Sequence, residues 1–183
     1  MIDQLEYNKR MQIASLKTGQ SAPHFTLPDL TGRLHNLEAL RGRIVIVNFW
    51  SAECPWCERA DRELLHHLLN WDAQVVLLPI ASNVNESREM IAAVAAKRQL
   101  PFVLLDEDHR VADLYGAQTT PHLFVVDSEG ILRYQGALDD VNFRQRQPTG
   151  NYLQMAVEAL IAGKTPQPAQ TPPYGCAIVR YMS

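Results

Sequence analysis

The chain has only three cysteines, no excess of positive charge and no long apolar run. Lysine and arginine number 17 against 20 acidic residues, so the formal charge is -3. Without a basic cluster, this balance does not predict binding to nucleic acid or to an anionic membrane surface. No stretch reaches the ~18 uncharged apolar residues of a membrane span, and residues 1–20 lack the apolar core of a signal peptide. We therefore expect a cytoplasmic protein with neither nucleic acid nor membrane as partner.

Sequence patterns for cofactors and metals are also missing. No Gly-x-Gly-x-x-Gly run is present, so we expect no bound nicotinamide or flavin. Cys54 and Cys57 have no second Cys-x-x-Cys to complete a zinc site. His66 and His67 follow them, but four ligands on one helix cannot easily surround a tetrahedral ion. We expect these histidines on an exposed helix face and no bound metal.

Apolar residues make up 46% of the chain, which has the size of one domain with its own core. Residues 1–20 are expected to form an N-terminal arm, residues 21–163 the domain and residues 164–183 a proline-rich, extended C-terminal tail. Residues 23–43 alternate apolar and polar side chains around Thr31-Gly32, which predicts a β-hairpin.

The rest of the domain alternates buried strands with amphipathic helices. Strands are expected at 44–50, 74–81, 101–106, 122–127 and 131–138, and helices at 55–71, 85–99, 108–116 and 150–162. This order predicts an α/β fold of three layers, α/β/α, around a central mixed sheet.

Cys54 and Cys57 lie where the strand at 44–50 gives way to a helix that Pro55 begins. Unpaired N–H groups at a helix start stabilise a thiolate, which is the form that attacks a disulfide. Cys57, one turn later, can then attack Cys54 and release a reduced substrate. A purely structural disulfide is not favoured here, because closing a four-residue loop would stabilise the fold by only ~2 kcal/mol. A redox pair is favoured over a metal site or two inert core residues, and a disulfide in a reducing cytoplasm is expected to be transient.

Pro55 and Trp56 lie between the two cysteines and are candidate substrate-binding residues. They are expected to set the helix geometry, and with it the relative stability of dithiol and disulfide. Trp56 is explained equally well as a partly exposed hydrophobic residue.

The segments "VNFWSAECPWC" and "APHFTLPDLTGRLHNLEALRGR" resemble the thioredoxin superfamily, in its redoxin branch of AhpC/TSA-like and TlpA/ResA-like proteins. In "YGAQTTPHLFVVDSEG" the family carries a cis-proline, which maps onto Thr120 and Pro121. The resemblance covers residues 23–162 and implies a thioredoxin fold. It also implies that the Pro121 loop faces Cys54 and pairs with an extended substrate segment as an added strand. His122 is a candidate positive charge beside Cys54, although a structural role is favoured.

Two departures from the family bear on activity. Thioredoxin has a buried aspartate that helps proton transfer at the second cysteine, where this chain has Asn48. The nearby acids Glu53 and Asp61 are candidates to replace it, although a solvated position is favoured for each. Peroxiredoxins have a proline at the position of Val47 and an arginine near the thiolate, whereas this chain has no proline there and no arginine next to Pro121. The sequence therefore predicts a thiol-disulfide oxidoreductase. A thiol peroxidase using Cys54 is the alternative, and a redox-inactive binding module is a third class.

The tail segment "PYGCAIVR" is similar to uncharacterised cytosolic peroxiredoxin-like redoxin proteins with a Gly-Cys-x-Ile tail. Cys176 in this segment is a third candidate thiol that an extended tail could lay over the active site. We favour the other interpretation, in which Cys176 anchors a tail strand as a small apolar residue. Expected partners are protein disulfides or a thioredoxin- or glutathione-type reductant, and the expected state is a monomer or weak dimer.

Overall fold

Residues 16–181 are the part of the chain that the computed structural model describes, with Asp72 described in its backbone only. Residues 1–15 of the arm predicted at 1–20 lie outside the described residues. The remainder of the arm runs beside the sheet, because Gly19 N donates to Leu132 O at 2.7 Å and Leu132 N donates to Gln20 O at 2.9 Å.

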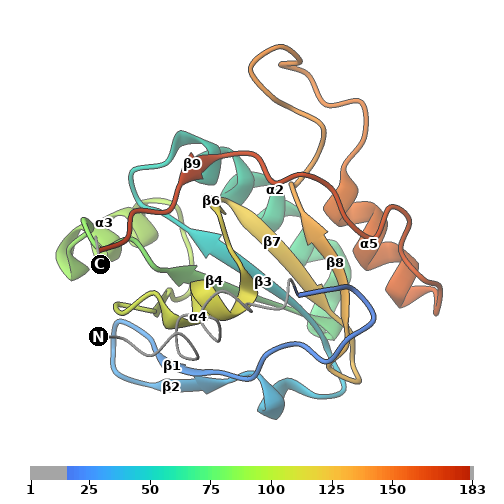
Figure 1. Ribbon diagram of the computed structural model, residues 1–183, viewed down its shortest axis with the longest axis horizontal. Helices are drawn as coiled ribbons and strands as arrows, with labels where there is room; N and C mark the ends of the chain where they lie inside the picture. Colours follow the sequence, from blue (N-terminus) through green and yellow to red (C-terminus); the bar gives the residue numbers. More distant parts are fainter. Residues whose placement is uncertain (1–15, 182–183) are drawn as a thin grey trace, which may run out of the picture.

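A five-stranded mixed sheet forms the centre of the molecule (Figure 1). Its strands, in spatial order, are β5 (Leu104–Leu105), β4 (Val75–Ala81), β3 (Ile44–Trp50), β7 (His122–Val126) and β8 (Leu132–Gly136). Strands β3, β4 and β5 are parallel, whereas β7 is antiparallel to both β3 and β8. All seven residues of β3 are buried, as expected for a central strand that is covered on both faces. The predicted mixed sheet is confirmed.

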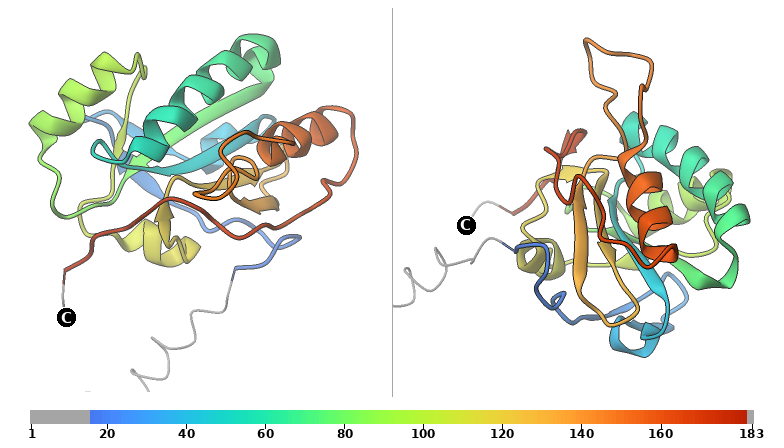
Figure 2. Two further views of the ribbon diagram at one scale, coloured as in Figure 1. Left: turned by 90° about the horizontal axis from the view of Figure 1, so that it is seen from above. Right: turned by 90° about the vertical axis from the view of Figure 1, so that its right-hand side faces the viewer.

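Helices cover both faces of this sheet (Figure 2). On one face lie α2 (Pro55–Trp71), α3 (Arg88–Lys97) and α5 (Tyr152–Ile161). On the other face lie α4 (Arg110–Tyr115) and the N-terminal hairpin. Side chains of β3 alternate between the two cores, as a strand requires: Ile46 packs toward α2 and Val47 toward α4.

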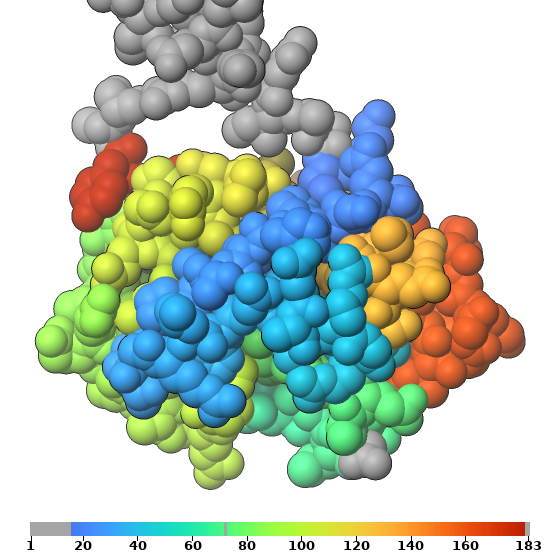
Figure 3. Space-filling view, turned by 90° about the horizontal axis from the view of Figure 1, so that it is seen from below, coloured from blue at the N-terminus to red at the C-terminus, as the bar shows by residue number. Residues whose placement is uncertain are grey.

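The predicted hairpin consists of β1 (Thr26–Pro28) and β2 (Leu34–Asn36), followed by the short 3-10 helix η1 (Glu38–Leu40). Asp29 Oδ1 accepts the N–H groups of Thr31 and Arg33 at 2.8 and 3.1 Å and so holds the turn closed. Figure 3 shows this N-terminal segment in blue, running across the face of the molecule beside α4.

Local capping residues explain where several elements begin and end. The Ser87 hydroxyl accepts from Met90 N at 3.2 Å and starts α3, and Gly116 in the left-handed conformation ends α4. A second 3-10 helix, η2 (Asp72–Gln74), joins α2 to β4. The strand predicted at 101–106 is wrong in length, since only β5 is paired. Pro101 lacks an N–H for a ladder. Asp106 N still donates to Ala81 O at 2.9 Å, while the Asp106 carboxylate accepts from Val111 N and Ala112 N at the start of α4.

The C-terminal tail is extended, as predicted, and crosses the front of the molecule in Figure 1. It forms β9 (Cys176–Ala177), which pairs antiparallel with β6 (Thr119–Thr120). This two-stranded pair lies directly before Pro121, so the fold brings the tail to the end of the sheet where α2 begins.

Candidate active site

Cys54 lies between the end of β3 and the first turn of α2. Its carbonyl accepts from Cys57 N at 3.1 Å and from Glu58 N at 3.2 Å, so Cys54 begins the helix. Pro55 occupies the first helical position, where the missing N–H breaks no hydrogen bond. The residues Cys54 and Cys57 are 1% and 0% exposed, and both are free thiols. The Cys-x-x-Cys pair therefore opens the helix as expected, but it is covered from solvent.

The two thiols of this pair have opposite acidities. A hydrogen bond from Cys57 is the main cause that lowers the pKa of Cys54 to about 5, with further hydrogen bonds from Cys176 and opposition from burial. Burial is the main cause that raises the pKa of Cys57 well above its ordinary value, followed by the hydrogen bond and charge of Cys54. At neutral pH the site therefore holds a thiolate at Cys54 and a protonated thiol at Cys57, which is the division of roles that exchange chemistry requires.

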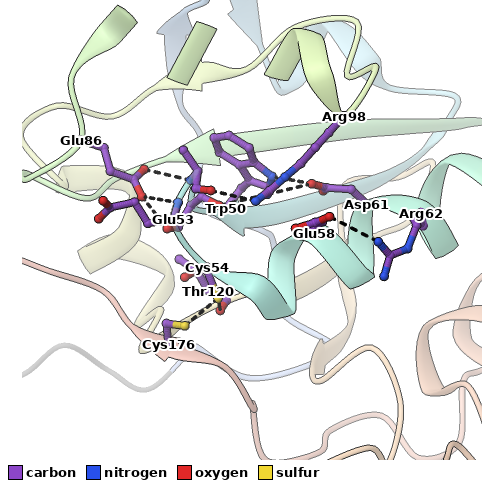
Figure 4. A network of polar contacts seen from close by, with 12 residues as sticks. Trp50, Glu53, Cys54, Glu58, Asp61, Arg62, Glu86, Arg98, Thr120 and Cys176 are labelled. Carbon is purple, nitrogen blue, oxygen red and sulfur yellow. Dashed lines mark hydrogen bonds and ion pairs between the residues drawn. The ribbon is translucent and has the colours of Figure 1, made fainter. Parts of the chain in front are cut away.

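The Thr120-Pro121 loop faces Cys54, as the resemblance implied. The peptide bond between these residues is cis, and Thr120 O lies 2.9 Å from Cys54 Sγ (Figure 4). Trp56 and Pro121 line one small pocket, where the Trp56 ring lies 4.9 Å from the ring of Tyr174. The structure thus brings the candidate substrate-binding residues to one place around the thiolate.

Cys176 also reaches this place. Its sulfur lies 2.7 Å from Cys54 Sγ, and it pairs across β6–β9 with Thr120 (Figure 4). Burial, followed by the neighbouring Cys54, raises the pKa of Cys176 to about 12. We expected Cys176 either to anchor a tail strand or to lie over the active site as a third thiol. In the structure these two positions are the same, because the tail strand that contains Cys176 lies over the active site.

Glu86 holds the loop that carries Cys54, a role that the sequence pattern did not indicate. Its carboxylate accepts from the Ser51 hydroxyl, and from Ala52 N and Glu53 N at 3.1 Å each. Glu86 lies in the turn before α3, and no local pattern distinguishes it there from a solvated acid. These contacts fix the backbone between β3 and the first thiol.

Asp61 is buried, and the expectation that it is solvated is wrong. Its side chain is 2% exposed and accepts from Trp50 Nε1 at 2.9 Å and from Arg98 Nη1 at 3.2 Å. Burial raises the pKa of Asp61 to about 6, against these two contacts. Its position four residues after Cys57 was the available signal, because that spacing places both residues on one helix face.

Arg98 is a second charged residue that sequence reasoning missed. Besides Asp61, it donates to Ser51 O at 3.3 Å and to Ala52 O at 2.7 Å, and its guanidinium lies 5.4 Å from the Trp50 ring (Figure 4). It joins the end of α3 to the loop before Cys54. Arg98 thus binds carbonyl groups of that loop, and Glu86 binds its N–H groups.

Other candidates have simpler outcomes. Glu53 is exposed, as expected, and Asn48 is buried with its side-chain amide unpaired within residues 16–181. Burial lowers the pKa of His122 to about 4, and Nδ1 accepts from Gln118 N at 3.3 Å. His122 is therefore neutral and adds no positive charge beside Cys54, in line with the favoured structural role. His66 is exposed.

Two further features concern metals and membranes. In the part of the chain that the structure describes, no three His, Cys, Asp or Glu side chains are grouped to hold a metal ion. Among the same residues, no helix combines the length and apolarity that crossing a bilayer requires.

A buried thiolate at a helix start that faces a cis-proline, on a mixed five-stranded sheet, defines a thioredoxin-like protein. The sequence profile of the AhpC/TSA family matches residues 18–135, and the chain belongs to this family. Both the expected fold class and the expected redoxin resemblance are confirmed.

Relatives with assigned activities are similar over about two thirds of the chain. The thiol-disulfide oxidoreductase ResA of Geobacillus thermodenitrificans is 32% identical over 117 residues, which are 63% of this chain and 67% of that protein. ResA of Bacillus subtilis is 31% identical over 117 residues, 63% of this chain and 65% of its own length. The thiol:disulfide interchange protein DsbE of Allochromatium vinosum is 30% identical over 128 residues, 68% of each chain. The match thus spans about two thirds of these relatives.

Two crystal structures match nearly the whole chain. A hypothetical protein of Sinorhizobium meliloti 1021 superposes with a TM-score of 0.81 at 29% identity, covering 92% of this chain and 97% of its own. An uncharacterized conserved protein of Geobacillus kaustophilus superposes with a TM-score of 0.84 at 27% identity, covering 92% and 94%. The similarity therefore includes more of the chain than the oxidoreductase relatives cover.

Proposed function

We propose that this protein exchanges its Cys54–Cys57 dithiol or disulfide with the disulfides or dithiols of partner proteins. The observation that carries the proposal is the split acidity of two adjacent sulfurs at a helix start, with a thiolate at Cys54 beside a protonated Cys57. The thiol-disulfide exchange activities of the relatives ResA and DsbE support the same chemistry, and the AhpC/TSA family match over residues 18–135 includes both thiols.

In the reducing direction, the Cys54 thiolate attacks one sulfur of a substrate disulfide. A mixed disulfide forms, and the other substrate sulfur leaves as a thiolate. Cys57 then loses its proton and attacks Cys54, which forms the Cys54–Cys57 bond and releases the second substrate thiolate. Two electrons pass from the protein to the substrate, and the opposite direction reverses each step.

The proton of Cys57 needs an acceptor in a buried site. Asp61 lies one turn further along α2 and is buried with Cys57, and its charge contributes to the raised pKa of that thiol. With its own pKa raised to about 6, Asp61 is ionised at neutral pH yet basic enough to take a proton. We therefore assign to Asp61 the role of proton acceptor for Cys57. In thioredoxin, a buried aspartate at the position that Asn48 occupies here has this role.

The backbone at Thr120 and Pro121 supplies the edge for an extended substrate segment, and Trp56 supplies an apolar contact beside it. Partners of this proposal are therefore disulfides in extended or unfolded protein segments, with a thioredoxin- or glutathione-type system to restore the dithiol. A cytoplasmic location and a monomer or weak dimer stay predictions of the sequence.

Reduction of insulin by dithiothreitol tests the proposal. The wild-type protein is expected to accelerate insulin precipitation, and Cys54→Ser is expected to abolish the acceleration. A Cys57→Ser/Cys176→Ser variant is expected to trap a mixed disulfide through Cys54, which mass spectrometry identifies. Precipitation at the rate of dithiothreitol alone would contradict the assignment. If hydrogen peroxide instead consumes the Cys54 thiol in a fast second-order reaction, the thiol peroxidase is the correct function.

A further inference from the structure

The C-terminal tail is held at two points, one on each side of Cys176. Upstream, Thr171 N donates to Gln135 O at 3.0 Å, and its hydroxyl accepts from Ala137 N at 3.0 Å. Downstream, Arg180 donates to Asp113 Oδ1 at 2.9 Å and to Ala117 O at 2.7 Å. The segment between these anchors is therefore stretched across the active-site end of the sheet (Figures 1 and 2).

Between the anchors, the tail pairs with the same edge that the proposed function gives to the substrate. Cys176 and Thr120 are partners across β6–β9, and Ile178 N donates to Gln118 O at 3.1 Å. Gly175 allows this close approach, because a Cβ at that residue would lie 2.2 Å from Thr120 O. Any larger residue there collides with backbone rather than with a flexible side chain.

The pairing places the Cys176 sulfur against the reactive sulfur. The two Sγ atoms are 2.7 Å apart, whereas a disulfide bond is about 2.05 Å long. Cys54 is 1% exposed with the tail in place, so a partner protein cannot reach the thiolate while the tail stays bound. An extended strand that presents a cysteine to Cys54 has the arrangement expected of a bound substrate.

We propose that the tail is an intramolecular substrate and that Cys176 is a third redox thiol, exchanging with the Cys54–Cys57 disulfide to form Cys54–Cys176. This inference rests on the proposed function of the Cys54–Cys57 pair. In the exchange, the Cys176 thiolate attacks the Cys54 sulfur, the Cys54–Cys57 bond breaks and the Cys54–Cys176 bond forms. Cys57 leaves as a thiolate and takes up the proton that Cys176 gave up. No electrons are gained or lost, so the step needs no external oxidant.

The acidity of Cys176 supports this order of events. In the reduced protein, burial is the main cause of the raised pKa of Cys176, and the hydrogen bond and charge of Cys54 add to it. When Cys54 is in a disulfide with Cys57, that charge is gone, and the Cys176 thiol ionises more readily. Burial still raises the pKa of Cys176 in the oxidised form, but the contribution of Cys54 is absent in the only state in which the tail thiol has a disulfide to attack.

The experiment follows disulfide formation in Cys57→Ser protein that is oxidised with diamide, a two-electron thiol oxidant. After acid quench, proteolysis and mass spectrometry, the expected product is an intramolecular link between Cys54 and Cys176. Adding Gly175→Ala is expected to slow its formation at least tenfold, because the added Cβ moves the tail off Thr120. Gly150→Ala, whose Cβ would meet nothing within 4 Å, is the matched control and is expected to leave the rate unchanged.

The wild-type protein supplies the second measurement. After oxidation, its peptide map is expected to contain both Cys54–Cys57 and Cys54–Cys176, and Gly175→Ala is expected to leave only the first. Free thiols at Cys54 and Cys176 after diamide treatment, intermolecular dimers alone, or equal rates with Gly175→Ala would each overturn the inference. Neither of these measurements contains a protein substrate, so they test the tail independently of insulin reduction. If the Cys54–Cys176 link forms but the protein does not accelerate insulin reduction, the proposed function is rejected and the contact between the tail and Cys54 is not.

Discussion

Replacing Asp61 by asparagine should change how the stability of the fold depends on pH. Asp61 has a folded-state pKa of about 6 against an ordinary value of 3.8, and its side chain is 2% exposed. Because the folded state holds the proton more tightly, ionisation of Asp61 destabilises the fold. The stabilising contribution is complete below pH ~3.8 and is lost as pH rises through about 6. A difference of roughly two pKa units corresponds to ~3 kcal/mol.

The asparagine side chain of the Asp61→Asn variant keeps the shape of the protonated carboxyl and can still accept from Trp50 and Arg98, but it does not titrate. The difference in free energy of unfolding between this variant and wild type should therefore shift by ~3 kcal/mol in favour of the variant between pH 4 and pH 8. Urea unfolding at a series of pH values measures this difference, and subtraction removes the contribution of other titrating groups. If the difference in free energy of unfolding does not change with pH, the reasoning that burial destabilises the ionised form of Asp61 is refuted.

The remaining predictions concern the thiolate, its loop and the tail. Ultraviolet thiolate absorbance of the reduced protein should titrate Cys54 with a midpoint of about 5, and Cys57→Ala, which removes the donor, should raise that midpoint; a wild-type midpoint near the ~8.5 of free cysteine would contradict the site geometry. Glu86→Gln should reduce the free energy of unfolding by ~1–3 kcal/mol, because one N–H acceptor of the loop is replaced by a donor. The exposed control Glu89→Gln should cost less than ~1 kcal/mol, and equal losses would refute the role of Glu86. Tyr134→Phe should reduce stability by ~1–3 kcal/mol, since the hydroxyl contacts Ala137 O and Thr171 Oγ1; an unchanged denaturant midpoint would count against the upstream tail anchor.

Elements with strong local signals were predictable. The continuous apolar run of β3, Pro55 at the start of α2 and Gly116 at the end of α4 each fix an element within a few residues. The length of β5 was not, because the chain turns away from β4 after the bond from Asp106 N to Ala81 O, and the Asp106 carboxylate contacts the start of α4. The β6–β9 pair was also beyond local patterns, since it joins segments far apart in the sequence.

The candidate site divides in the same way. Cys54 and Cys57 follow from the spacing of their motif and its place at a helix start, whereas Pro121 follows from the resemblance to the redoxin family. Glu86 and Arg98 follow from neither, because a charged residue beside a helix is usually solvated. Only tertiary packing buries Glu86 and holds the half-buried Arg98 against the loop before Cys54. Asp61 shares a helix face with Leu64, which is fully buried, so the apolar stripe of α2 did carry the signal.

A redox titration of Cys176→Ser protein, with free thiols counted in each buffer, tests the central claim most directly. The variant removes the tail thiol and leaves only the pair at the helix start. Cys54 and Cys57 should lose their thiols together in one two-electron step, with ~30 mV for each tenfold change in the ratio of disulfide to dithiol. If the two thiols oxidise independently, or if both stay reduced across the potentials of glutathione buffers, the pair is not a redox couple.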